Sequence, residues 1–162
     1  MFMKQSELFW DLGHDFVKEI MERSGKKSLA KGDVLFFEGA PATHFYTLIK
    51  GNVRLMAGTS GQAEFVLNHT GEAFGWSSLT GRDRYSATAE CLSPTSVVQV
   101  PRDDFEEICL KYPVDGLVFM RRLARLLGQR LLRSYDLMGT SMGVGDYMVY
   151  GTGQVQELAI EE

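Results

Sequence analysis

The chain has 162 residues, 44% hydrophobic and 23% charged, which fits one globular domain with a full core. Its formal net charge of −4 argues against a surface built as a whole to bind nucleic acid. No run of about 18 apolar residues is present, so the sequence predicts no membrane span. The N-terminus carries Glu7, Asp11 and Asp15, unlike a signal peptide, so we expect a cytoplasmic protein.

The first 25 residues are expected to form short helices, because apolar residues recur there at helical spacing and Gly13 divides the run in two. From Ser28 the period of the apolar residues changes to two. Turn signals at intervals of about ten residues predict a compact antiparallel sandwich or barrel over residues 28–101. Its strands are expected at residues 28–30, 34–37, 45–49, 53–57, 63–69, 85–91 and 95–100.

Residues 102–138 are expected to form two helices, separated by a break at Tyr112 and Pro113. The second, over 114–138, carries residues that alternate steps of four and three, the spacing by which one helix packs along another. This heptad seam comprises Met120, Ala124, Leu127, Leu131, Ser134 and Met138. It predicts a homodimer through the helix 114–138; the alternative is a helix that packs only on its own core.

The last segment, residues 139–162, is rich in glycine and ends in two glutamates. This composition predicts a flexible, acidic tail after a domain that spans residues 1–138. Within that domain we distinguish N-terminal helices at 1–25, a sheet region at 28–101 and C-terminal helices at 102–138.

Residues 71–79 form the stretch around which the chain is organised. Gly71 and Gly75 flank a turn and can adopt backbone angles closed to other residues. Ser77 lies where a short helix can begin, and free amides at such a start attract anions. A half-buried strand is expected at 85–91, directly after this loop. The loop therefore predicts an anion site, with an ordinary bend between two strands as the alternative.

With these elements in order, the chain resembles the cyclic nucleotide-binding domain of the catabolite-activator superfamily and of the regulatory subunits of cyclic-nucleotide-dependent kinases. The matching segments are residues 32–39, residues 45–53, and Gly71-Glu72 with Ser86-Ala87. The resemblance covers roughly residues 5–138. It implies an α+β, mainly β fold: an antiparallel β-roll, or jelly roll, with short N-terminal helices and a long C-terminal helix that dimerises and covers the ligand.

The resemblance also implies a ligand site, in which Glu72 accepts a hydrogen bond from a ribose hydroxyl and an arginine binds the cyclic phosphate. Here Tyr85 stands in place of that arginine, and a hydroxyl cannot form a bidentate, charge-assisted clamp. Arg84 or Arg82 can supply a substitute cation. The ligand is thus cyclic AMP, cyclic GMP, another small anion, or absent. The candidate ligand-binding residues are Gly71, Glu72, Gly75, Trp76, Ser77, Arg84, Tyr85, Ser86, Ala87 and Ser134.

Transcription factors of this superfamily continue into a helix-turn-helix, for which residues 139–162 are too few and too acidic. The sequence therefore predicts a stand-alone sensor or regulatory module that does not bind nucleic acid directly. One alternative is a protein-interaction scaffold whose pocket is filled by Trp76 or Tyr85.

An enzyme is the second alternative, because the metal-binding cupins share a β-roll. Here His14, His44 and His69 are scattered, and Cys91 and Cys109 lack a metal-ligand spacing, so they are expected to be reduced packing residues. No nucleophile motif is present. We therefore expect no catalytic activity and no metal.

Overall fold

The computed structural model describes residue 6 and residues 8–58, 63–141, 147–149 and 155–157. By its internal contacts the chain forms two compact units, residues 1–122 and 123–162, whose boundary falls within the longest helix. The predicted domain boundary after residue 138 stays a prediction.

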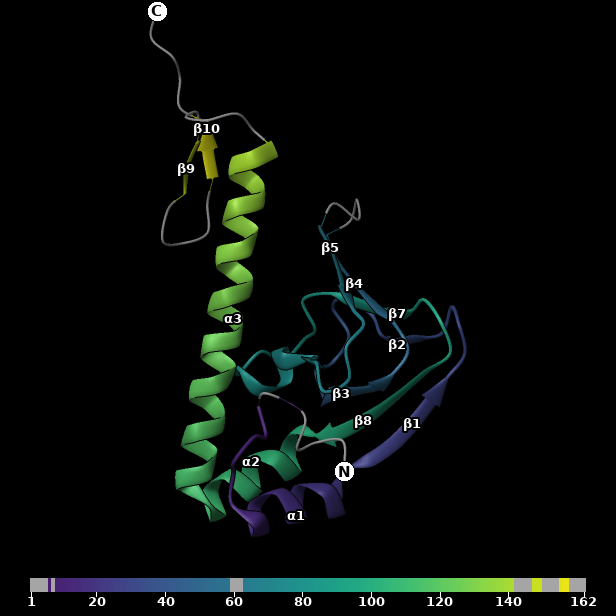
Figure 1. Ribbon diagram of the computed structural model, residues 1–162, viewed down its shortest axis with the longest axis vertical. Coiled ribbons are helices and arrows are strands. Elements are labelled where there is room, and N and C mark those ends of the chain that lie inside the picture. The colour runs from purple at the N-terminus through teal and green to yellow at the C-terminus, as the bar shows by residue number, and fades with distance from the viewer. Residues whose placement is uncertain (1–5, 7, 59–62, 142–146, 150–154, 158–162) are drawn as a thin grey trace, which may run out of the picture. The chain divides into compact units, whose positions relative to one another are not determined.

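The first unit is built from two antiparallel four-stranded sheets that face each other as a β-roll (Figure 1). One sheet has the order β1-β8-β3-β6 and the other β2-β7-β4-β5. Their strands are β1 (Gly25–Leu29), β2 (Val34–Phe36), β3 (His44–Lys50), β4 (Val53–Ala57), β5 (Ala63–Leu67), β6 (Ala73–Phe74), β7 (Thr88–Cys91) and β8 (Thr95–Pro101). The predicted mainly-β roll is confirmed, and the strands fall within a few residues of their expected bounds, except for β6, which was not expected.

Helices cover one sheet of the roll on its outer face. They are α1 (His14–Arg23), α2 (Arg102–Lys111) and the beginning of α3 (Pro113–Ser141). The prediction of two N-terminal helices is wrong in part: residues 8–11 form turns, and Asp11 has a positive φ of 53°, which ends any helix before Gly13. Gly25, which we expected to end the first helix, begins β1 instead.

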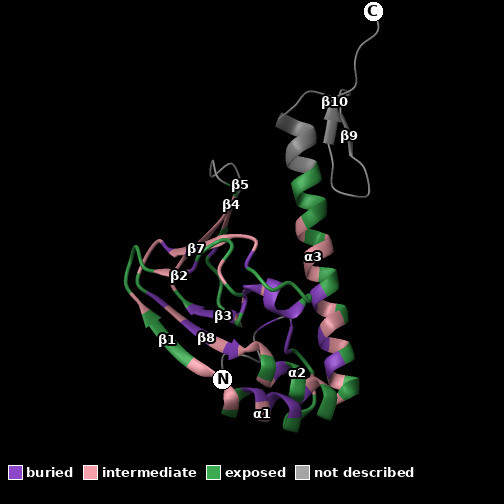
Figure 2. Cartoon of the chain, turned by 180° about the vertical axis from the view of Figure 1, so that it is seen from behind, coloured by how far each residue is buried: buried purple, intermediate pink, exposed green. Residues whose placement is uncertain are grey.

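Strand β3 is buried on both faces, because it lies between the inside of the roll and the helices (Figure 2). Tyr46 and Leu48 belong to the apolar cluster inside the roll. The ring of Phe45, on the opposite face, lies 5.2 Å from that of Phe105 on α2 and 6.0 Å from that of Phe119 on α3. Alternate residues of a strand point to opposite faces, so this one strand joins two cores.

The second unit contains the rest of α3 and a short antiparallel pair, β9 (Tyr147–Val149) and β10 (Val155–Glu157). The tail was expected to lack regular structure, and this pair departs from that expectation; residues 142–146, 150–154 and 158–162 lie outside the described residues. No helix in the described part of the chain is both long enough and apolar enough to cross a membrane.

Candidate ligand-binding site

The glycine-flanked loop forms as the sequence predicts. Gly71 and Gly75 have φ values of 91° and 74°, in the region that glycine tolerates best. A Cβ atom on Gly75 would lie 3.0 Å from the Tyr46 ring and 3.2 Å from the His44 carbonyl oxygen. Gly75 is therefore required both by its backbone angles and by close packing, and it directs the chain into the short 3-10 helix η2 (Trp76–Leu79).

Tyr85 packs in the core of the roll. Its side chain is only 4% exposed, and its ring stacks on Phe36 with centroids 3.9 Å apart. Its hydroxyl donates to the His44 carbonyl at 2.7 Å and accepts from the His44 amide at 3.1 Å. The last residue pair between β3 and β6 is Tyr46–Phe74. The Tyr85 hydroxyl therefore bonds the β3 backbone at His44, two residues before that pair and beyond the end of β6.

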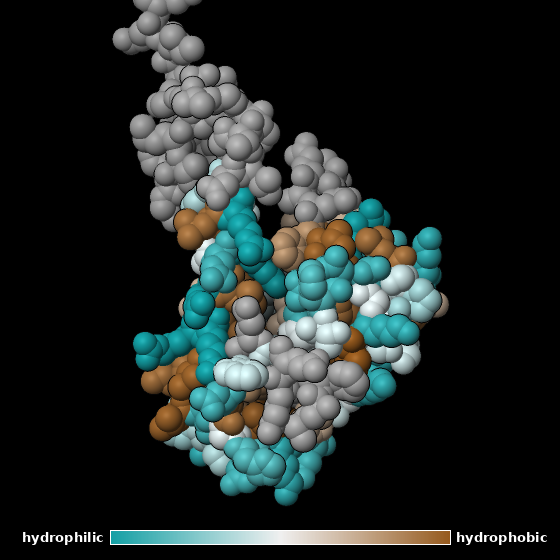
Figure 3. Space-filling model, in the orientation of Figure 1, coloured by the Kyte–Doolittle hydropathy of each residue, from teal (hydrophilic) through white to brown (hydrophobic). Residues whose placement is uncertain are grey.

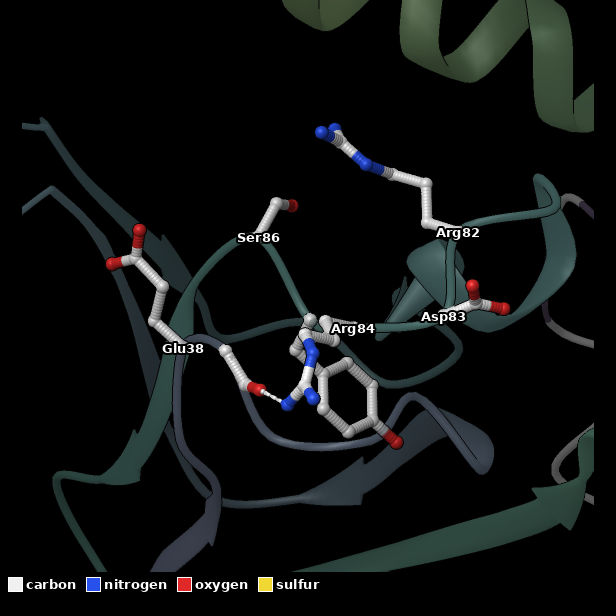
Figure 4. Close-up of a pocket in the computed structure, with 7 residues that line it drawn as sticks. Glu38, Arg82, Asp83, Arg84 and Ser86 are labelled. Atoms are coloured by element: carbon white, nitrogen blue, oxygen red, sulfur yellow. Dashed lines mark hydrogen bonds between the residues drawn. The ribbon is translucent and has the colours of Figure 1, made fainter.

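Within the described part of the chain, two cavities adjoin the segment Tyr85–Ser86. The inner one has a volume of only about 60 Å³ and is lined by Phe36, Leu55, Gly75, Trp76, Ser77, Tyr85, Ser86 and Ala87. The outer, open one has about 650 Å³ and is lined by Glu38, Gly39, Arg82, Asp83, Arg84, Tyr85 and Ser86 (Figure 4). Small-molecule pockets are typically of about 300–1,000 Å³. The inner cavity is therefore too small for a nucleotide, whereas the outer pocket has sufficient volume for a small ligand.

Both candidate cations lie in the outer pocket. Arg84 is already engaged, because one of its guanidinium nitrogens donates to the Gly39 carbonyl at 2.6 Å. Arg82 is exposed and extends over the pocket from the loop after η2 (Figure 4). Glu38, the carboxylate on the opposite side, accepts a hydrogen bond from the Gly58 amide at 3.0 Å.

A pair of serines connects the two cavities. The buried Ser77 hydroxyl accepts from the Ser86 amide at 3.3 Å and lies 3.2 Å from the Ser86 hydroxyl. Both were predicted site residues, and the structure brings them together with Gly75, Trp76, Tyr85 and Ala87 around the inner cavity.

Glu72 has a different position from the one that the sequence predicts. Its carboxylate accepts hydrogen bonds from the amides of Asn68 and His69, both at 2.8 Å, and it lines neither of the two cavities. Gly71, which donates its amide to the Leu48 carbonyl at 2.8 Å, lines neither cavity as well. Both residues shape the turn before β6. That Glu72 binds a ribose hydroxyl stays a prediction.

Ser134 belongs to the second unit, where its hydroxyl donates to the Arg130 carbonyl at 3.0 Å. Several lining residues were not among the candidate ligand-binding residues: Arg82, which we named only as a substitute cation, and Asp83 in the outer pocket, Phe36 and Leu55 in the inner cavity, and Glu38 and Gly39, which come from the turn between β2 and β3. This turn was recognised from the sequence, but nothing in its pattern indicates that it lies opposite the 82–86 loop.

Arg102, at the first position of α2, ties this loop to the helices. Its side chain donates to the Arg82 carbonyl at 3.4 Å and lies 3.9 Å from the Asp83 carboxylate. It also pairs with Glu106 at 3.0 Å, within α2. The loop that borders the outer pocket is therefore connected directly to the first turn of α2.

Three further titratable groups have shifted pKa values that follow from burial. Burial lowers the pKa of His44, with a further contribution from the charge of Lys27. Burial raises the pKa of the Cys109 thiol to about 11 and also raises that of Cys91, so neither is a thiolate at neutral pH. Among the described residues, no three His, Cys, Asp or Glu side chains gather as metal ligands would.

The family model of the cyclic nucleotide-binding domain matches residues 26–112, more than half of the chain. The chain belongs to this family. The cyclic AMP receptor protein of Thermus thermophilus is 29% identical over 137 residues, which are 83% of this chain and 61% of that protein. A second curated relative, from Rhodopseudomonas palustris, is matched over 26% of its length. The chain thus spans less than two thirds of either relative.

Solved structures of family members have the same fold. The sensor domain of the transcriptional regulator DNR from Pseudomonas aeruginosa superposes with a TM-score of 0.66 at 25% identity, over 80% of this chain and 86% of that one. A cyclic nucleotide-binding domain from Methylobacillus flagellatus has a TM-score of 0.74 at 20% identity, over 89% and 82% of the two chains.

Proposed function

We propose that this chain is a ligand-responsive regulatory or sensor module of the cyclic nucleotide-binding type, without catalytic activity. The observation that carries the proposal is the outer pocket of about 650 Å³, because residues 82–86 of the family's ligand loop line it with two arginines and a serine. Family membership supports a regulatory role.

We further propose that helix α3 carries the response as a homodimer interface. Leu117 and Leu131, which continue one heptad pattern, are 61% and 50% exposed. Apolar side chains also gather where α2 ends and α3 begins (Figure 3). A groove of about 440 Å³ lies there, lined by Phe105, Glu106, Cys109, Leu110, Pro113, Gly116, Leu117 and Met120. Since Leu117 and Met120 belong to both the groove and the heptad pattern, a second copy of the chain is its expected occupant.

Isothermal titration with cyclic AMP and cyclic GMP tests the sensor function. Saturable heat with either nucleotide, together with a ligand-dependent change in hydrodynamic radius, is the expected result. If neither nucleotide nor any simple oxyanion binds, the chain is better described as a protein-interaction scaffold, the alternative that the small inner cavity favours.

Light scattering on the purified chain tests the dimer. Leu117→Glu is expected to convert it to a monomer, because a charged side chain would be buried without a partner in the interface. Val66→Glu, at a similarly exposed position on β5, is the control and is expected to leave the mass unchanged. A monomeric wild-type chain at all concentrations tested would refute the dimer and leave the ligand site unaffected.

A further inference from the structure

Arg82 is an unused cation beside the outer pocket. Its backbone is held on both sides, since its amide donates to the Ser77 carbonyl at 3.3 Å and its carbonyl accepts from Arg102. In the part of the chain that the structure describes, its guanidinium has no hydrogen-bond or ion-pair partner. By contrast, one guanidinium nitrogen of Arg84 donates a hydrogen bond to the Gly39 carbonyl oxygen. A fixed backbone with a free guanidinium over a pocket is suited to binding an anion from solvent.

Ser86 can contribute a hydroxyl proton to the same anion. The Ser77 oxygen already accepts from the Ser86 amide, so its own proton can be donated to the Ser86 oxygen 3.2 Å away. In that arrangement the proton of the Ser86 hydroxyl is left for a ligand. Figure 4 shows the side chains of Arg82 and Ser86 on the same side of the pocket, with Glu38 farther away and its carboxylate held by Gly58.

Among the residues that the structure describes, the inner cavity of the roll has no comparable place for the rest of a nucleotide. The stack of Tyr85 on Phe36 fills the interior, and Trp76 borders the remaining cavity of about 60 Å³. A base or sugar would have to stay in the open outer pocket. Its contribution to binding would be small there, because little of its surface would leave water.

On these grounds, and resting on the proposed sensor function, we infer that the ligand is a small oxyanion bound outside the roll, its charged group held by Arg82 and Ser86. The recognised chemistry is a phosphate or phosphate-ester group. A nucleobase contributes little, so cyclic AMP, cyclic GMP and inorganic phosphate compete for one site and the two nucleotides bind with similar affinity.

Calorimetric titration of the full chain with inorganic phosphate, cyclic AMP and cyclic GMP tests this inference. Arg82→Ala is expected to weaken every one of them by about 10-fold or more, since a hydrogen bond to a charged group is lost. Arg82→Lys keeps the charge but not the planar fork, so an intermediate loss is expected. The control is Arg121→Ala, an exposed arginine on α3 outside the pocket, which is expected to bind as the wild type does. Thermal melts check that each variant is folded.

Salt gives an independent readout, because an open ionic contact is screened and affinity should fall as sodium chloride is raised. Nucleotide binding that survives Arg82→Ala, or that differs more than about 10-fold between cyclic AMP and cyclic GMP, would overturn the oxyanion inference while leaving the sensor function intact. Absence of binding by all three probes to the wild type would overturn both.

Discussion

Tyr85→Phe isolates the hydroxyl that completes strand β3. The variant keeps the ring stacked on Phe36 but removes both hydrogen bonds to the His44 backbone. Because Tyr85 is 4% exposed, water does not readily replace the lost hydroxyl. A buried backbone group left without a partner costs about 1–3 kcal/mol. A loss of about 2 kcal/mol corresponds to a melting temperature lower by roughly 4–8 °C in a chain of this size.

The assay is thermal and urea unfolding followed by circular dichroism. Tyr135→Phe, at a tyrosine 39% exposed on α3, is the matched control and is expected to change stability by less than about 0.5 kcal/mol. Equal stabilities for Tyr85→Phe and the wild type would refute the assignment of Tyr85 to the core. Tyr85→Arg is expected to unfold the chain instead of restoring a phosphate clamp, because it would bury an unpaired guanidinium against Phe36.

Three further outcomes are expected. Gly75→Ala and Gly81→Ala both place an alanine at a φ near 74°, costing roughly 1–2 kcal/mol each; only Gly75→Ala also meets the Tyr46 ring, so equal losses in urea melts would contradict the packing described. Stability is expected to decrease as pH falls below about 6.5. The cause is the lowered pKa of His44, which lets the unfolded chain take up a proton before the folded chain does. Thermal melts between pH 7 and 5 should show a flatter profile of stability against pH for His44→Gln than for the wild type. Elemental analysis of the purified chain is expected to find no stoichiometric zinc, and a bound metal that survives dialysis would reopen the enzyme alternative.

Local patterns were sufficient to predict a compact antiparallel sandwich or barrel, and the resemblance to a known family implied the roll. Turn residues every ten positions delimit the hairpins, and the change of apolar period near Ser28 separates helices from strands. The break at Pro113 marks the point where α2 gives way to α3. Each of these patterns involves residues close together in the chain, so it can be recognised from the sequence alone.

The candidate site depends on contacts between segments that lie far apart in the sequence, and these contacts could not be predicted from the sequence alone. Tyr85 was selected as a site residue, but the depth of its side chain is decided by Phe36 and by the His44 backbone, which lie more than 40 positions earlier. Glu72 was expected to bind a ribose, and in this structure one of its carboxylate oxygens, Oε2, accepts hydrogen bonds from two amides only three and four residues before it. Hydrogen bonds from nearby backbone amides compete with hydrogen bonds from a ligand, and the residue types alone do not indicate which of the two forms.

Through Arg102, the loop that borders the outer pocket is in direct contact with the helical layer. The loop of Arg82 and Asp83 cannot be displaced without lengthening or exchanging its bonds to the first residue of α2. A ligand in the outer pocket would thus act on the first turn of α2 and not on the aromatic residues inside the roll. Under the proposed sensor function, a shift of this loop would reach the first turn of α2 through the Arg102 guanidinium.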